Sequence, residues 1–85
     1  MAVRIIYFAW VREKIGRPEE SIELPAHVRT VADLISYLKS CGAEYQNAFQ
    51  RDDLVRVAVD QIHVKPTTEI VDAREVAFFP PVTGG

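Results

Sequence analysis

The sequence predicts an α+β fold of two layers, in which one main helix packs on one face of a mixed β-sheet. Short runs of β-branched and aromatic residues, separated by turn residues, indicate the strands. Only one longer segment has apolar residues at helical spacing. With 85 residues the chain can form one domain with one modest core, and 48% apolar residues make it too apolar for a disordered protein.

The first third of the chain predicts a central strand, a short helix and an edge strand. Residues 3–8 are mostly β-branched or aromatic, which is typical of a central strand that is covered on both faces. Residues 9–15 have apolar residues one helical turn apart, and Gly16 is suited to end a helix. Residues 20–24 alternate between polar and apolar side chains before Pro25, which indicates an edge strand.

The main helix is predicted over residues 31–41. Thr30 is a favourable N-cap, and Asp33 completes an aspartate variant of the capping box. Gly42 is expected to end the helix in the left-handed conformation. One face of this helix is apolar and consists of Val31, Leu34, Ile35, Leu38 and Cys41. Cys41 is therefore expected to pack in the core rather than to act as a nucleophile or a sulfur relay.

The second half predicts two paired strands and a last strand. Residues 44–51 are ambiguous and could form a turn of helix. Residues 54–60 alternate, with valines on one side, and residues 61–64 are expected to return beside them after a tight turn. Residues 75–79 form a last short strand, and we expect the first and last strands to lie side by side at the centre because they are the most apolar.

Composition excludes several classes of function. The net charge of −2 and the scattered basic residues give no basis for binding nucleic acid. The longest apolar run, residues 5–11, is too short to span a membrane. The single cysteine excludes an internal disulfide and suggests a reducing compartment, so a cytoplasmic location is expected. His27 and His63 are far apart in the sequence and have no companion at ligand spacing, so no metal site is expected.

The remaining polar and aromatic candidates favour structural roles. Glu19-Glu20 and Asp52-Asp53 resemble carboxylate pairs, but solvated loop charges are expected rather than an acid/base dyad. Trp10 follows the first strand and is expected to be partly buried.

The last ten residues stand apart because residues 76–85 carry no charged side chain. A glycine pair alone would favour a frayed chain end. Together with the preceding aromatic and proline pairs, however, Gly84 and Gly85 suggest a tail that enters a narrow channel in a partner. We therefore predict a folded domain over residues 1–79 and a projecting, flexible tail over residues 80–85.

The residues of this tail can be given separate roles. Pro80 and Pro81 favour extended geometry and should aim the tail away from the sheet. Adjacent strand residues face opposite sides, so only one phenylalanine is expected in the core. Because Phe79 adjoins the tail, it is expected outside the core as an anchor for a partner, with Phe78 inside. The conduit and the reactive group at the end of the tail are expected to be Val82, Thr83, Gly84 and the carboxylate of Gly85.

Four segments together carry a resemblance to a known family. They are the ending EVAFFPPVTGG, the preceding VRVAVDQIHV, the helix TVADLISYL and the opening IIYFAWVREKIG. These segments resemble the small subunits of molybdopterin synthases, the sulfur carriers of molybdenum cofactor biosynthesis, over essentially the whole chain. The resemblance implies a β-grasp, ubiquitin-like fold, which agrees with the predicted order of elements. One departure is Asp72-Ala73-Arg74, where family members often carry Gly-Asp after the aspartate.

The resemblance also implies a sulfur-transfer cycle at Gly85. An activating enzyme of the ubiquitin-activating type would adenylate the terminal carboxylate with ATP and Mg²⁺, and sulfur from a persulfide donor would then replace AMP. The large synthase subunit would receive the tail, and the thiocarboxylate would donate its sulfur to cyclic pyranopterin monophosphate to form the dithiolene of molybdopterin. The family suggests a heterotetramer, no cofactor bound by this chain and no catalytic side chain in it.

Two alternatives remain open from the sequence. The same carrier chemistry could serve thiamine synthesis or tRNA thiolation, although the aromatic and proline residues of the tail favour molybdopterin. The chain could also be a ubiquitin-like modifier that is conjugated through Gly85 to lysines of target proteins.

Overall fold

The computed structural model describes residues 2–81, which form five strands, three α-helices and one 3-10 turn. In chain order these are β1 (Ala2–Tyr7), α1 (Ala9–Ile15), β2 (Glu19–Glu23), α2 (Val31–Lys39), α3 (Ala43–Ala48), the 3-10 turn η1 (Asp52–Leu54), β3 (Arg56–Val59), β4 (Ile62–Val64) and β5 (Glu75–Phe79).

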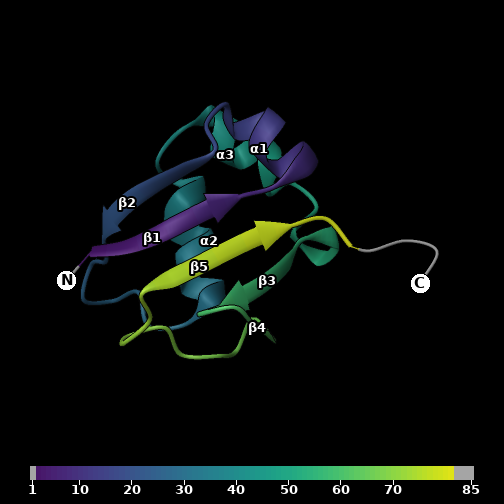
Figure 1. The fold of residues 1–85 in the computed structure, drawn as a ribbon. Helices are drawn as coiled ribbons and strands as arrows, with labels where there is room; N and C mark the ends of the chain where they lie inside the picture. The colour runs from purple at the N-terminus through teal and green to yellow at the C-terminus, as the bar shows by residue number, and fades with distance from the viewer. Residues whose placement is uncertain (1, 82–85) are drawn as a thin grey trace.

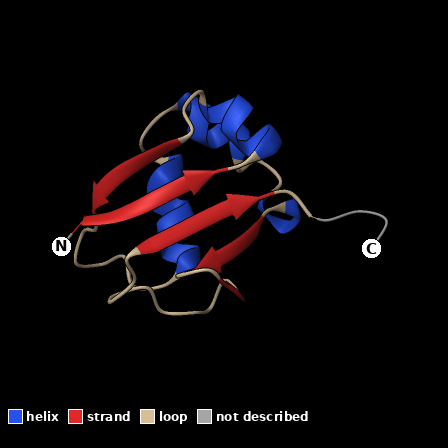
Figure 2. Cartoon of the chain, in the orientation of Figure 1, coloured by secondary structure: helices blue, strands red, loops and turns tan. Residues whose placement is uncertain are grey.

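The strands form one mixed sheet in the order β2-β1-β5-β3-β4. The central β1 and β5 are parallel, whereas the other neighbours are antiparallel. Helix α2 lies across one face of the sheet, while α1 and α3 pack together near one end of it (Figures 1 and 2). The α+β class, the central position of the first and last strands and the edge position of β2 are thus confirmed.

Strand β1 corrects one expectation, because only one of its faces lies in the core. Val3, Ile5 and Tyr7 are buried, but Arg4 is exposed and Ile6 is only partly buried. The prediction of a strand covered on both faces was wrong because the helices of the described chain gather on one side of the sheet. Its apolar composition reflects instead an open face with apolar residues of its own.

Helix α1 begins and ends where the sequence predicts. Gly16 has φ 89° and its N–H donates to the carbonyl of Arg12 at 2.8 Å, so the glycine ends the helix in the left-handed region. Val11 and Ile15 face the core, and Trp10 packs against it while remaining partly exposed, as expected.

The predicted capping box at the start of α2 is present. The backbone N–H of Asp33 donates to Thr30 Oγ1 at 3.1 Å, and the N–H of Thr30 donates to Asp33 Oδ2 at the same distance. Hydrogen bonds from the backbone of Arg29 and Thr30 lower the pKa of Asp33 because they favour its charged form.

The other end of α2 differs from the prediction. The helix ends at Lys39 with Ser40 as its cap, so Cys41 lies beyond the helical repeat and is exposed, not buried. Cys41 Sγ and Ser40 Oγ both donate to the carbonyl of Tyr37, which satisfies this helix end locally. Gly42 has φ 166°, an extended conformation, and caps the start of α3 instead of closing α2.

The ambiguous segment after α2 is helical. Helix α3 contributes Tyr45 and Ala48 to the core, and Phe49 follows them there with no exposed surface. The short η1 then leads through Val55 into β3, and Val55 and Val57 are buried as the alternation predicted.

The hairpin between β3 and β4 uses the predicted tight turn. Asp60 and Gln61 have φ of 49° and 71°, as two-residue hairpin loops require. Asp60 Oδ1 also accepts hydrogen bonds from the backbone of Arg74 and Glu75, each at 3.0 Å, and so ties this turn to the start of β5. Ala73 does not have a positive φ, so alanine is unstrained there.

Among the polar residues, Glu20 differs most from its predicted position. It lies in β2, partly buried, where Oε2 accepts from Tyr7 OH at 2.7 Å and from Tyr45 OH at 2.5 Å, while Arg17 Nη1 donates to Oε1 at 3.1 Å. The network joins β1, β2 and α3. The expectation of a solvated loop charge was wrong here because the fold brings two tyrosines to the same carboxylate, although Asp52 and Asp53 are exposed as expected.

Replacing Glu20 should destabilise the domain. In Glu20→Gln, the amide oxygen can still accept from both tyrosine hydroxyls, but the NH₂ that replaces Oε1 faces the Arg17 guanidinium, and the charge that strengthens these hydrogen bonds is lost. We expect the free energy of unfolding, measured by urea denaturation, to fall by roughly 1–3 kcal/mol. The matched control Glu19→Gln removes an exposed charge that pairs with Arg4 and should change it by less than about 1 kcal/mol. Equal effects of the two substitutions would contradict this role for Glu20.

Tyr45 should make stability depend on pH in the alkaline range. Burial and the hydrogen bond to Glu20 raise the pKa of Tyr45 to about 12, from an ordinary tyrosine value of about 10. Between these values the folded state keeps the proton that the unfolded state has lost, so the free energy of unfolding falls as the pH rises. In Tyr45→Phe this fall, measured by thermal unfolding above pH 10, should be shallower than in the wild type. The same slope in both proteins would show that Tyr45 does not contribute.

Candidate functional site

The face of the sheet opposite α2 carries an apolar surface. Ile6 pairs with Ala77, and Ala77 pairs with Ala58, so these three side chains form a row across β1, β5 and β3. They lie on the side opposite the core residues Ile5, Val76 and Val57. Ile6 is partly buried, and Ala58 and Ala77 are each only 7% exposed. Phe8 and Phe79 extend this row toward the ends of β1 and β5. We call Ile6, Phe8, Ala58, Ala77 and Phe79 the open-face patch.

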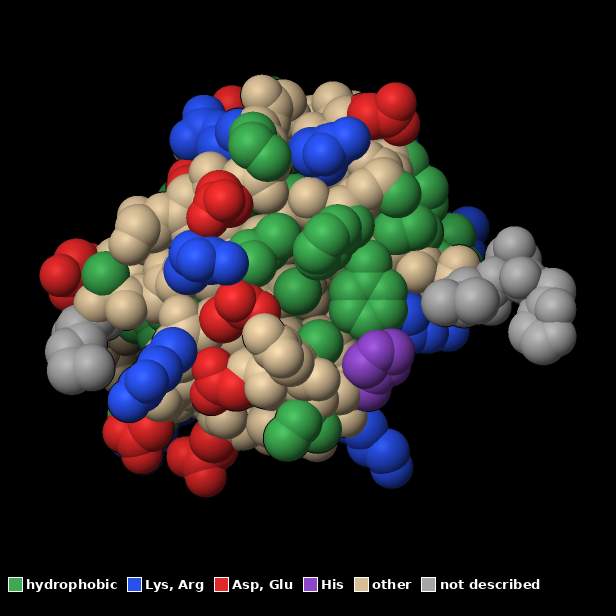
Figure 3. Space-filling model, in the orientation of Figure 1, with side chains coloured by type: hydrophobic (Ala, Val, Ile, Leu, Met, Phe, Trp, Pro, Cys, Tyr) green, Lys and Arg blue, Asp and Glu red, His purple; other side chains and the backbone are tan. Residues whose placement is uncertain are grey.

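Along the strands, the open face changes from a charged end to an apolar end. At the start of β1 and β5, Arg4 forms ion pairs with Glu19 at 3.2 Å and with Glu75 at 3.3 Å. Toward the other end of these strands the surface becomes apolar, as the green area in the centre and right of Figure 3 shows. The open-face patch therefore extends toward the tail.

The two adjacent phenylalanines lie as the sequence predicts. Phe78 has no exposed surface and packs with its ring centroid 5.1 Å from that of Phe49. Phe79 is partly buried, and its ring centroid lies 5.1 Å from that of the exposed His63. Phe79 is thus available on the open face, and its role as a partner anchor stays a prediction.

The topology of the sheet determines what surrounds the root of the tail. Because β1 and β5 are parallel, both end at the same edge of the sheet, and the N–H of Phe8 donates to the carbonyl of Phe78 at 3.0 Å. Strand β3 is antiparallel to β5 and begins there, with Arg56 opposite Phe79. We call this edge the tail edge. It is bordered by Phe8, α1 and η1.

The predicted reactive segment lies largely outside the described residues. Pro80 and Pro81 follow β5 and are partly buried. Their predicted role in partner binding is not tested by this geometry. The predicted conduit and acceptor, Val82, Thr83, Gly84 and Gly85, lie beyond Pro81 and are not described.

Metal-ligating side chains do not gather in the described part of the chain. Within residues 2–81 no group of three or more His, Cys, Asp or Glu side chains could hold a metal ion, and both histidines are exposed. Cys41 is also exposed, at the end of α2. None of the helices in the described part of the chain is long and apolar enough to cross a membrane.

Sequence reasoning missed two features of this surface. It did not identify Ile6, Ala58 and Ala77 as a row, because their alignment depends on the register of three strands. It also missed a pocket between α1, α3 and η1, which is lined by residues from three separate segments. Phe8, the last residue of the predicted first strand, was the one local signal for the patch, and the structure shows it to be exposed.

Comparison with known proteins agrees with this geometry. The ThiS family model matches residues 5–85, a range that includes the undescribed tail. The molybdopterin synthase sulfur carrier subunit of Escherichia coli is 35% identical over 83 residues, which are 98% of this chain and 99% of that protein.

Solved structures extend this agreement to the fold. A Pyrococcus furiosus chain described as a molybdopterin converting factor subunit 1 superposes with a TM-score of 0.74 at 33% identity, covering 96% of this chain and 99% of that one. The small archaeal modifier protein 1 of Haloferax volcanii has a TM-score of 0.71 at 20% identity, covering 95% and 98%, and shows likeness of fold alone. The chain therefore belongs to the ThiS family, with the β-grasp, ubiquitin-like fold.

Proposed function

We propose that this protein is the sulfur carrier subunit of a molybdopterin synthase. The observation that carries this proposal is the match to carrier subunits over almost the whole length of both chains. The uncharged tail and the open-face patch that leads toward it support the same function.

The reactive group in this proposal is the carboxylate of Gly85. A carboxylate is a poor electrophile until it is adenylated to the mixed anhydride with AMP. The terminal sulfur of the donor's persulfide then attacks the acyl carbon and AMP leaves, which gives an acyl disulfide. A thiol of the donor system attacks the donor's sulfur, and the S–S bond breaks to leave the thiocarboxylate and a disulfide. The resulting thiocarboxylate is a sulfur nucleophile on a tether, and it donates its sulfur to cyclic pyranopterin monophosphate in the large subunit. ATP with Mg²⁺ and the persulfide belong to the activating and donor proteins, and this chain binds no cofactor of its own.

The folded domain positions this tail. Val82, Thr83 and Gly84 have no charge to desolvate, so they can enter a narrow channel at little cost. The large subunit docks on the open-face patch, where Phe79 provides an aromatic anchor next to the root of the tail. Binding of the domain therefore raises the local concentration of Gly85 at the partner's active site.

Sulfur loading can be measured directly on the intact protein. After incubation with the activating enzyme, ATP, Mg²⁺ and a persulfide donor, we expect intact mass spectrometry to show the exchange of one oxygen for sulfur at Gly85. Deletion of Gly85 should abolish this exchange. The thermal midpoint of the deletion variant should change little if the tail is not structural. No exchange in the wild type would refute the carrier function.

Phe79→Ala should weaken binding to the large synthase subunit by roughly 10- to 100-fold, because truncated aromatic anchors typically cost about 1–3 kcal/mol. Isothermal titration calorimetry measures this change. Ile62→Ala is a matched control, since Ile62 is 66% exposed but pairs with Val59, whose side chain packs against the core on the other side of the sheet. If both variants bind like the wild type, Phe79 is not the anchor.

A further inference from the structure

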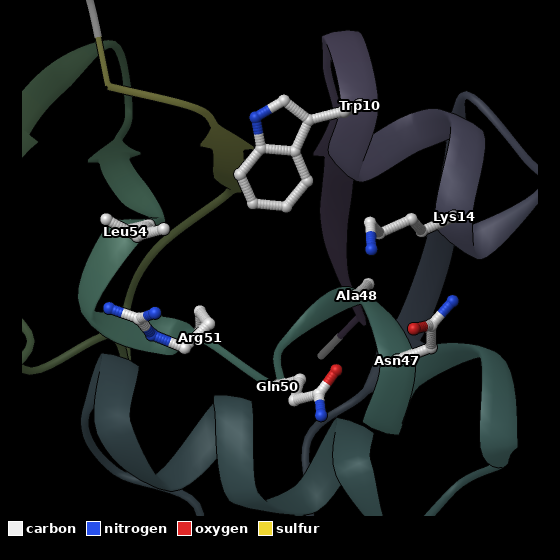
Figure 4. A pocket seen from close by; sticks show the side chains of 7 residues that line it. All are labelled: Trp10, Lys14, Asn47, Ala48, Gln50, Arg51 and Leu54. Atoms are coloured by element: carbon white, nitrogen blue, oxygen red, sulfur yellow. The ribbon is translucent and has the colours of Figure 1, made fainter.

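A pocket of about 270 Å³ opens at the tail edge of the domain. Its floor is formed by α3, and its walls are formed by α1 and by residues 50–54 (Figure 4). Trp10 and Lys14 project from α1 on one side, while Arg51 and Leu54 lie on the other. Helix α1 packs against both α3 and β5, so the pocket lies beside the strand from which the tail departs.

The polar groups of the pocket are suited to an anion. No carboxylate lines it, and its polar side chains all carry N–H donors: Trp10, Lys14, Asn47, Gln50 and Arg51. Arg51 binds Asp53 through Nε and Nη2, at 3.1 and 3.0 Å, so its charge is already compensated.

Lys14 is the cation that remains available. Its Nζ lies 5.9 Å from the centroid of the Trp10 ring, and it forms no ion pair with any residue in the range 2–81. The apolar part of the pocket, from the indole and Leu54, limits access of water to a bound charge. A carboxylate on a short apolar stem therefore matches both parts of the pocket.

The position of the pocket indicates where such a carboxylate would come from. A partner that takes the tail into its active site must approach the edge at which β5 ends. Such a partner would contact the open-face patch on the open side of the sheet. The pocket lies beside α1 and α3 at the same edge, within reach of the same partner. A contact there would fix the rotation of the domain about the tail, which an apolar patch alone does not define.

We propose that this pocket receives an aspartate or glutamate side chain of the protein that takes the tail, with Lys14 as its main ionic partner. The inference rests on the proposed function, because the tail is what brings that protein to this edge. It adds a charged contact of defined sign to the apolar docking surface, and it assigns to Lys14 and Trp10 a role in orienting the complex.

Charge reversal in the pocket tests the contact. We expect Lys14→Glu to weaken binding to the large synthase subunit by about tenfold or more at low salt, and the difference from the wild type to shrink as salt is added. Arg74→Glu is the matched control, since it makes the same change of charge on an exposed residue at the opposite end of β5. Lys14 is exposed, so unchanged thermal unfolding of the variant should confirm that its fold is intact.

Zero-length cross-linking with a carbodiimide identifies the occupant. The reagent activates a carboxylate, which the Lys14 amine attacks to form an amide, and the urea derivative leaves. We expect mass spectrometry of the complex to find Lys14 joined to an aspartate or glutamate of the large subunit. This link should be lost in Lys14→Arg, whose guanidinium keeps the charge but does not form the amide.

The outcomes separate this inference from the proposed function. If the wild type neither binds the large subunit nor is loaded with sulfur, the carrier function itself fails. If it binds, but Lys14→Glu binds equally well and no Lys14 cross-link forms, the pocket does not contact the partner. Trp10 is the only tryptophan of the chain, so its fluorescence reports on the pocket. A response to inorganic phosphate together with normal binding of Lys14→Glu would mean a small-anion site and would also overturn the inference.

Discussion

The parallel pairing of β1 with β5 is the interaction on which the rest of this structure depends. It joins residues about seventy positions apart, aligning Tyr7 with Phe78, and it places both strands at the centre of the sheet. Parallel neighbours must end at the same edge, so the chain enters α1 and leaves β5 at adjacent points. The root of the tail, the open-face patch and the pocket beside Trp10 lie together for this reason.

The two faces of β5 have different roles, since one packs in the core and the other lies on the open side of the sheet. Phe78 packs against Phe49 in the core, while Phe79, one residue later, lies on the open face beside His63. Along the same face, Ala77 and Ala58 pair with each other and are each only 7% exposed, so their larger neighbours supply most of the accessible apolar surface. An apolar surface at the end of β5 suits the proposed function, in which the domain presents its own chain end to a partner.

Local signals in the sequence were sufficient for most of the elements. The capping box at Thr30 and the left-handed Gly16 lie where they were predicted. These caps, like the alternation in β2 and β3, depend only on residues that are close together in the sequence. The errors occur where distant segments meet. Cys41 fits the apolar face of α2 by periodicity, but α2 ends at Lys39, two residues before it. Tyr45, Ala48 and Phe49 of the next segment enter the core instead.

The sequence by itself determined the class of the fold, the identity of the inward phenylalanine and the chemical character of the tail. These follow from periodicity, from the alternation of side chains along a strand and from the absence of charge after Glu75. Only the tertiary structure decided that Glu20 would accept two tyrosine hydroxyls, that Ile6, Ala58 and Ala77 would form one row, and that Trp10 and Lys14 would face Arg51 across a pocket. The physical reason is that strand register and helix packing bring together residues that are far apart in the sequence, so no local pattern predicts that they are neighbours.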